Sequence, residues 1–190
     1  MRIIDQAYKV QIECKKSIFI AHLYPFADFK NSLEALKKEH KKAGHFVWAL
    51  RYLNDFKQII EDKSDDGEPK NTAGAPCLNV LRGAGLINIA VVVVRYFGGI
   101  KLGTGGLVRA YSESINAAIR LARLSEFELK ESLNLSLPLS LFSRMKHYLT
   151  QNKLNFNATL IENEFLLEIL VNEEERLNLI KFCKKLGLRL

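Results

Sequence analysis

The segment of the sequence best suited to bind an anion is FGGIKLGTGG, residues 97–106, which lies between an apolar run and a helical pattern. Glycine lets the backbone approach a ligand closely. The start of a helix presents free N–H groups and the positive end of its dipole. Arg95, Lys101 and Arg109 add positive charge around this segment. The candidate anion-binding residues are Arg95, Lys101, Gly103, Thr104, Gly105, Gly106 and Arg109. The alternative is that the glycines only permit sharp turns and close packing.

Two common phosphate motifs are absent from this segment. Gly98 and Gly103 have the glycine spacing of a Walker A loop, but Thr104-Gly105 stands where Lys-Ser/Thr is required. Gly103 and Gly105 match the start of the dinucleotide fingerprint, but Val108 occupies the third glycine position. Neither a nucleoside triphosphate site nor a dinucleotide site is therefore predicted here.

An acidic loop, residues 62–68, offers a second kind of chemistry. Asp65, Asp66 and Glu68 could hold Mg²⁺, which prefers one or two carboxylates together with water. The spacing and the later glutamate of an EF-hand are missing. The alternative, which we favour, is a turn whose carboxylates accept hydrogen bonds from nearby backbone N–H groups. No cofactor is predicted, and Mg²⁺ is the only candidate.

Histidine and cysteine give little support to catalysis. His45 has no second ligand or carboxylate at metal-binding spacing, so a structural role is expected. Cys77 could be a nucleophile with His45 as its base, but a buried apolar role is the stronger expectation. The three cysteines are widely separated and form no CxxC pair, which argues against a zinc site and a disulfide framework.

Positive charge is concentrated in the first two thirds of the chain. Residues 1–123 contain 19 Lys/Arg and 12 Asp/Glu, a balance of +7, whereas residues 124–190 contain nine of each. This asymmetry suggests a polyanionic partner such as nucleic acid. From charge alone, the alternative of a solvated basic surface that only aids solubility is favoured. The N-terminus lacks an apolar signal sequence, and no apolar run is long enough to span a membrane. A cytoplasmic location and no membrane partner are expected.

Hydrophobic periodicity predicts an α+β fold with two domains, residues 1–124 and 125–190. In the first, strands are expected at residues 8–14, 18–24, 46–53, 57–61 and 88–96, with helices at 28–42, 73–82 and 106–124. In the second, the pattern predicts a strand at 127–137, a helix at 140–152, strands at 156–161 and 165–171, and a helix from 173. A last strand at 188–190 would complete the split βαβ pattern of a ferredoxin-like domain.

The central part of the chain resembles the YigZ/IMPACT family, in particular its two-domain bacterial YigZ-type members. The resemblance lies in DDGEP at 65–69, TAG at 72–74 with Pro76, and VVVRYFGGIKLGTGGLVRAY at 92–111. KSIFIA at 16–21 and HFVWA at 45–49 match more weakly. The chain departs from the family at Lys70-Asn71, where a small residue and glycine are usual. Either the loop is less bent, or Asn71 takes the left-handed conformation of glycine. Lys70 adds a positive charge and joins the candidate anion-binding residues.

The resemblance implies an N-terminal α/β sandwich similar to domain four of elongation factor G and a C-terminal ferredoxin-like domain similar to its domain five. It implies nucleic-acid binding or translation regulation, and no settled reaction. Our leading hypothesis is a non-catalytic protein that binds RNA or the ribosome. One alternative is a metal-assisted enzyme acting on a small phosphorylated substrate. The other is a protein-interaction module that uses the sheet of the C-terminal domain.

Overall fold

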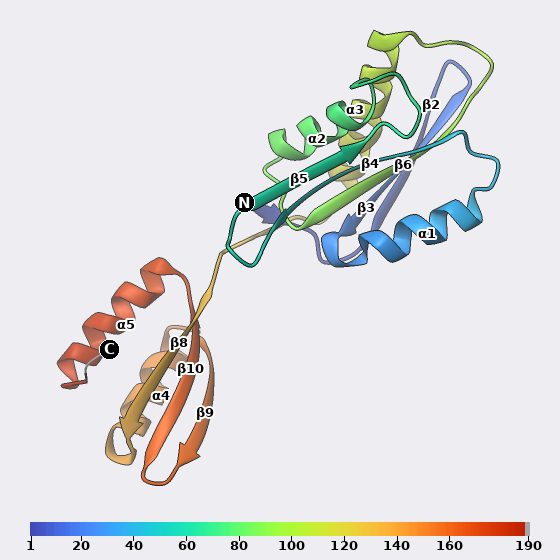
Figure 1. The fold of residues 1–190 in the computed structure, drawn as a ribbon. Coiled ribbons are helices and arrows are strands. Elements are labelled where there is room, and N and C mark those ends of the chain that lie inside the picture. The colour runs from blue at the N-terminus through green and yellow to red at the C-terminus, as the bar shows by residue number, and fades with distance from the viewer. Residues whose placement is uncertain (189–190) are drawn as a thin grey trace. The chain divides into compact units, whose positions relative to one another are not determined.

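The computed structural model describes residues 1–188, and its mixed α/β chain forms two compact units, Met1–Phe127 and Glu128–Leu190 (Figure 1). The division follows Phe127, whereas the sequence placed a domain boundary after residue 124. A short antiparallel pair of strands, β1 (Arg2–Ile3) and β7 (Ser125–Glu126), joins the two ends of the first unit. This pairing keeps Ser125 and Glu126 in the first unit.

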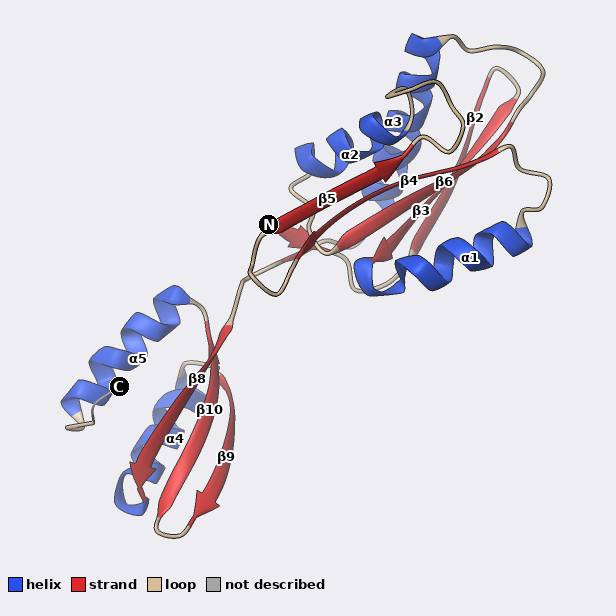
Figure 2. Ribbon diagram, viewed as in Figure 1, coloured by secondary structure: helices blue, strands red, loops and turns tan. Residues whose placement is uncertain are grey.

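The first unit is built on a five-stranded sheet in the order β2-β3-β6-β4-β5 (Figure 2). Its strands are β2 (Tyr8–Cys14), β3 (Ser17–Pro25), β4 (His45–Leu53), β5 (Ile59–Ser64) and β6 (Ile89–Tyr96). Every neighbouring pair is antiparallel. The predicted hairpin of β2 and β3 and the predicted central strand β6 are confirmed. The apolar run of β6 is explained by helices on both faces of the sheet, because each face of the strand is covered.

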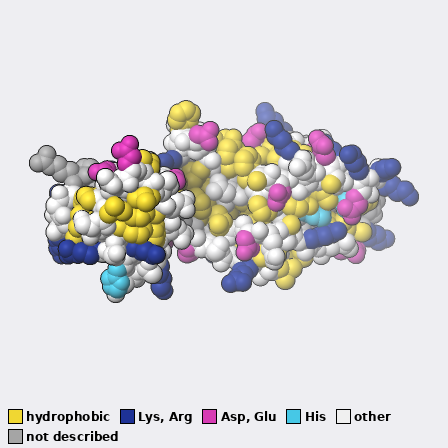
Figure 3. Space-filling model, turned by 90° about the horizontal axis from the view of Figure 1, so that it is seen from below, with side chains coloured by type: hydrophobic (Ala, Val, Ile, Leu, Met, Phe, Trp, Pro, Cys, Tyr) yellow, Lys and Arg dark blue, Asp and Glu magenta, His cyan; other side chains and the backbone are white. Residues whose placement is uncertain are grey.

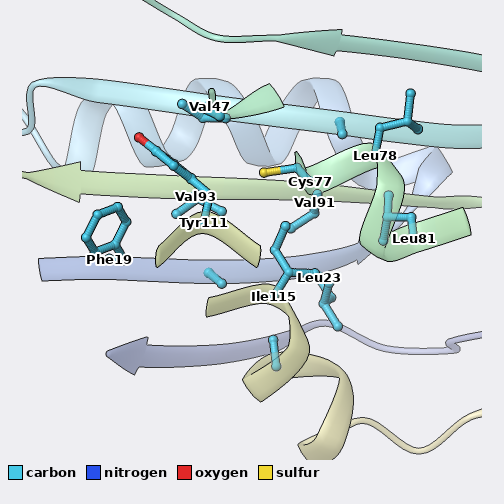
Figure 4. Packing of buried hydrophobic residues seen from close by; sticks show 14 of the residues in the cluster. Phe19, Leu23, Val47, Cys77, Leu78, Leu81, Val91, Val93, Tyr111 and Ile115 are labelled. Atoms are coloured by element: carbon cyan, nitrogen blue, oxygen red, sulfur yellow. The ribbon is translucent and has the colours of Figure 1, made fainter. Parts of the chain in front are cut away.

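Helices α2 (Gly74–Gly83) and α3 (Thr104–Leu121) pack on one face, and α1 (Phe29–Glu39), preceded by the short helix η1 (Phe26–Asp28), packs on the other. Side chains from the sheet and from α2 and α3 interlock in the larger core (Figure 4). Those with no exposed surface include Phe19, Leu23, Val47, Cys77, Leu81, Val91, Val93, Tyr111 and Ile115. Burial of each such large apolar side chain stabilises the fold by about 1.5–3 kcal/mol.

The second unit contains β8 (Glu131–Pro138), α4 (Leu139–Gln151), β9 (Asn155–Ile161), β10 (Glu164–Val171) and α5 (Glu173–Lys185). Its antiparallel sheet has the order β8-β10-β9. Asn172 and Glu175 form a capping box that fixes the start of α5. Leu188 lies in no strand, and the remainder of the strand predicted at 188–190 lies outside the described residues.

Candidate nucleic-acid interface

The segment between β6 and α3, residues 97–103, is called the glycine loop here, and it lies against the turn between β2 and β3. The backbone N–H of Gly98 donates to Ser17 Oγ at 3.1 Å. A Cβ atom at Gly98 would lie 2.0 Å from the carbonyl carbon and oxygen of Lys16, so only glycine fits. Lys15 and Lys16 both have positive φ, as a tight hairpin turn requires. The contact therefore brings two lysines of the hairpin to the glycine loop.

The glycines of this region divide into two groups according to what surrounds them. Gly98 is crowded by backbone, and a Cβ at Gly106 would lie 3.1 Å from Leu102 Cβ, so both serve packing. Gly103 and Gly105 face open space, with nothing within 4 Å of an added Cβ. Gly103 has a φ of 71°, which favours glycine for conformational reasons. Gly105 is helical and uncrowded, so neither its conformation nor its packing explains the absence of a side chain.

The first turn of α3 presents free backbone donors beside basic side chains. Gly103 occupies the N-cap position, and no side chain caps the helix. The helix is 18 residues long, and no acidic residue occupies its first turn. Gly103, Thr104 and Gly105 are exposed, as are the side chains of Lys101 and Arg109. We call these five residues the glycine-loop surface.

Further lysines lie at the end of the sheet where β6 ends and the glycine loop begins. The connection between α1 and β4 carries exposed Lys41 and Lys42, and Gly44 N–H donates to Arg95 O at 3.0 Å. That bond places the connection beside the end of β6, from which the glycine loop emerges. Figure 3, which is seen from below, shows several Lys and Arg side chains, with Asp and Glu among them, toward this end of the first unit. Lys41 and Lys42, like Lys15 and Lys16 of the hairpin turn, therefore lie at the same end of the sheet as the glycine loop.

Arg95, which the sequence grouped with the anion-binding residues, lies in a buried cluster. It is 5% exposed, and its Nη1 pairs with Glu68 Oε1 at 2.5 Å. Its guanidinium also lies over the rings of Phe19 and Phe97, at 5.4 and 5.7 Å from their centroids. The positive charge of Arg95 is therefore neutralised by Glu68, and the side chain anchors the base of the glycine loop.

Glu68 is the centre of this cluster, which we call the Glu68 cluster: Glu68, Arg95, Tyr111 and His45. The hydroxyl of Tyr111 donates to Glu68 Oε1 at 2.7 Å, and His45 Nε2 lies 3.9 Å from the same oxygen. Burial, followed by the negative charge of Glu68, raises the pKa of Tyr111 well above its usual value. Tyr111 therefore stays protonated and acts as a donor. The acidic loop and the end of β6 are brought together here, but through a buried ion pair.

The other two acidic-loop carboxylates accept backbone hydrogen bonds. Asp65 accepts from the N–H groups of Asn71, Ala73 and Gly74 at 2.8, 3.1 and 2.8 Å. Burial acts to raise the pKa of Asp65, but these three bonds, together with the positive charge of Lys63, outweigh it and leave the pKa below its ordinary value. Asp66 Oδ2 accepts from Phe46 N–H at 2.6 Å.

This geometry is the capping arrangement that the sequence offered as the alternative to Mg²⁺. In residues 1–188 no group of three His, Cys, Asp or Glu side chains is placed to hold a metal ion. Asn71 has a φ of 61°, which confirms the left-handed conformation considered for it. Exposed Lys70 precedes it in the loop that Asp65 holds.

The sequence predicted a structural role for His45 but not its partners, and it did not predict the role of Tyr111. His45 starts β4 directly opposite Arg95 in the strand register, and its Nδ1 lies 2.8 Å from Asp66 O. Its spacing to Glu68 in sequence carries no signal of this contact. Tyr111 was predicted only to lie in the helix at 106–124. Cys77 is fully buried and burial raises its thiol pKa, which confirms the expected apolar role.

The same segments carry the match to a known family. The model of the Impact N-terminal domain matches residues 15–119, which include the hairpin turn, the acidic loop, the glycine loop and most of α3. The chain belongs to the IMPACT family. It is 31% identical over 175 residues to the IMPACT family member YvyE of Bacillus subtilis, covering 90% of this chain and 80% of YvyE. It is 46% identical over 113 residues to YigZ of Escherichia coli, covering 57% of this chain and 54% of YigZ.

A crystal structure described as that of a hypothetical protein is similar over both units of this IMPACT family member. It is 32% identical, covers 96% of this chain and 92% of its own, and has a TM-score of 0.63. The two-unit fold is therefore shared with a solved protein.

Among the helices described, none is long and apolar enough to cross a bilayer.

Proposed function

We propose that this IMPACT family member is a non-catalytic, cytoplasmic protein that binds RNA, in particular on the ribosome, and thereby regulates translation. The observation that carries the proposal is Gly105, whose missing side chain leaves open space at an uncapped helix start. A phosphate there would accept from backbone N–H groups and lie near Lys101 and Arg109. Such contacts hold a nucleic-acid backbone without reading its sequence.

The finer fold assignments form part of this proposal. We propose that the first unit has an α/β sandwich fold like that of elongation factor G domain four, and that the second has a ferredoxin-like fold. The order β8-β10-β9, with α4 after β8 and α5 after β10, supports the second assignment. Likeness of fold is an associational argument for ribosome binding, so the charge and geometry of the glycine-loop surface carry the weight.

Co-sedimentation with ribosomes at low and high salt tests the proposal. The wild-type chain is expected to sediment with ribosomes at low salt and to be released at high salt, because phosphate contacts release counterions. The double variant Lys101→Ala/Arg109→Ala is expected to stay in the supernatant at both. Lys184→Ala is the control, because Lys184 is an exposed lysine of the second unit. Equal sedimentation of all three proteins would refute the proposal.

A protein-docking role for the second unit has separate support. On the sheet face away from the core, Leu166 and Leu170 are each 42% exposed and alternate with Glu164 and Glu168. None of the three strands of this sheet contains Lys or Arg. An apolar face with negative charge suits a protein better than RNA. Leu166→Lys should abolish capture of such a partner and leave RNA affinity unchanged; an equal loss of both would argue against it.

The metal-assisted enzyme is the weaker alternative. Glu68 does reach Arg95, but both charged groups are buried in their own ion pair. Asp65 and Asp66 are engaged by backbone donors. Calorimetric titration with Mg²⁺ and a nucleotide panel distinguishes this function: saturable Mg²⁺ binding that Asp65→Asn removes would favour it over the RNA-binding proposal.

A further inference from the structure

A groove of about 450 Å³ lies on the α1 face of the first unit, away from the glycine-loop surface. Its volume is within the range of small-ligand pockets. The residues that matter for its chemistry are Phe26, Phe29, Lys30, Trp48, Tyr52 and Asp62. On the face drawn in Figure 3, exposed hydrophobic side chains of the first unit are interspersed with Lys and Arg.

The groove exists because α1 covers only part of its face of the sheet. The helix packs on β3 and β6, while β4 and the edge strand β5 extend beyond it. Tyr52 pairs in register with Ile60, and Leu50 with Asp62, so these side chains share one face. Trp48 follows the same alternation along β4. The floor of the groove is therefore sheet, and its wall is η1 and α1.

The aromatic groups offer flat surfaces to a planar ligand. Phe26 and Tyr52 stack with their centroids 3.9 Å apart and their planes 5° apart. Trp48 and Phe29 lie with centroids 5.2 Å apart, and Trp48 is partly exposed. Aromatic rings held in this way stack a further ring at little entropic cost. An aliphatic chain could bury apolar surface there but would gain no ring stacking.

Two opposite charges stand at the rim of the groove. Lys30 and Asp62 are both exposed. One oxygen of Asp62 accepts the N–H of Lys63 at 2.8 Å, which orients the carboxylate. A ligand that satisfies the whole groove has a planar ring, N–H donors for the carboxylate and a negative group for the ammonium. The excess of 19 basic over 12 acidic residues in positions 1–123 favours a net anion over a zwitterion such as an aromatic amino acid.

We propose that this groove binds a nucleotide. The base stacks on Trp48 or Tyr52, an exocyclic amino group donates to Asp62, and the phosphate pairs with Lys30. The nucleotide is either free or an unpaired residue of an RNA, since both present the same chemistry. The site is separate from the glycine-loop surface. Tyr52 lies near the end of β4, whereas His45, which pairs with Arg95 at the base of the glycine loop, begins β4.

The full chain contains its own probe, because Trp48 is its only tryptophan. AMP is expected to quench Trp48 fluorescence saturably, whereas ribose 5-phosphate, which lacks the base, is expected to leave it unchanged. Lys30→Glu should raise the Kd for AMP about tenfold or more, equivalent to at least about 1.4 kcal/mol, and should leave the Kd for adenosine unchanged. Tyr52→Ala should weaken both. Phe56→Ala is the matched control, because Phe56 is 83% exposed and lies outside the groove.

Several results would overturn the proposal. These are the absence of saturable quenching by AMP, quenching by phenylalanine but not by AMP, or AMP binding that neither Lys30→Glu nor Tyr52→Ala changes. A single-stranded oligoadenylate identifies the source: tighter quenching than by AMP indicates RNA, and tighter quenching by AMP indicates a free nucleotide; both support the groove. Lys101→Ala should leave AMP quenching intact, so failure of the groove and failure of the proposed RNA surface are observed separately.

Discussion

Replacement of Gly105 by alanine should have opposite effects on folding and on RNA binding. Gly105 is helical, exposed and has open space where a Cβ would lie. Alanine is preferred over glycine in a helix by roughly 0.5–1 kcal/mol. The variant should therefore be more stable than the wild type by up to about that amount. Gly105 thus weakens its helix without any gain in packing or conformation, and such a glycine is expected where a ligand approaches the backbone.

The same methyl group should weaken RNA binding. The Cβ atoms of a helix tilt toward its N-terminus, so the methyl would project to where a phosphate meets the first N–H groups of α3. A hydrogen bond to a charged group contributes about 1.5–3 kcal/mol. Loss of one such bond corresponds to a roughly ten- to hundredfold higher Kd.

Urea unfolding and fluorescence anisotropy with a labelled RNA at fixed salt measure the two effects. Gly83→Ala is the matched control, because Gly83 is also helical, also has open space around it, and ends α2 instead. It should be stabilised in the same way and should bind RNA like the wild type. If Gly105→Ala binds RNA as tightly as Gly83→Ala, no phosphate approaches Gly105 and the reasoning is wrong.

Three further predictions concern the elements that hold the interface. Glu68→Ala should lower the free energy of unfolding by about 3–5 kcal/mol, because it leaves the buried guanidinium of Arg95 unpaired; a loss below about 1 kcal/mol in urea unfolding would contradict the ion pair. Asp65 has a lowered pKa in the folded state, so the stability it contributes is complete above its unfolded pKa and is lost as the pH falls through the folded value. The difference in unfolding free energy between wild type and Asp65→Ala should therefore shrink below about pH 4, and a difference that is constant down to about pH 2 would count against the capping bonds. Gly98→Ala should cost more than about 2 kcal/mol, because its Cβ would overlap the backbone of Lys16; an unchanged thermal midpoint would show that this approach is not made.

Much of the fold could be predicted because hydrophobic periodicity is a local signal. The alternation of residues 8–14 gave β2, and the unbroken apolar run gave β6 at the centre of the sheet. The ends of elements were less accurate. The basic residues after Glu39 were assigned to α1, but the helix ends there and His40 leaves the helical conformation. The strand expected from residue 127 begins at Glu131, because Phe127 donates to Met1 O in the first unit.

The candidate site was predicted only in part, because its contacts are non-local. The sequence could not distinguish glycines that pack from glycines that leave open space, and only the geometry separates Gly98 from Gly105. Arg95 and Glu68 are 27 residues apart, and their pairing depends on how the acidic loop folds over the end of the sheet. The prediction that Asp65 caps backbone N–H groups needed only residue type and a turn, both of which are local.

The salt dependence of RNA affinity tests the central claim most directly. For the wild type, log Kd is expected to rise linearly with log salt concentration, and its slope should fall by about one for each of Lys101→Ala and Arg109→Ala. Lys184→Ala should leave the slope unchanged. A wild-type affinity that does not depend on salt, or identical slopes for all four proteins, would contradict a phosphate-binding role for the glycine-loop surface.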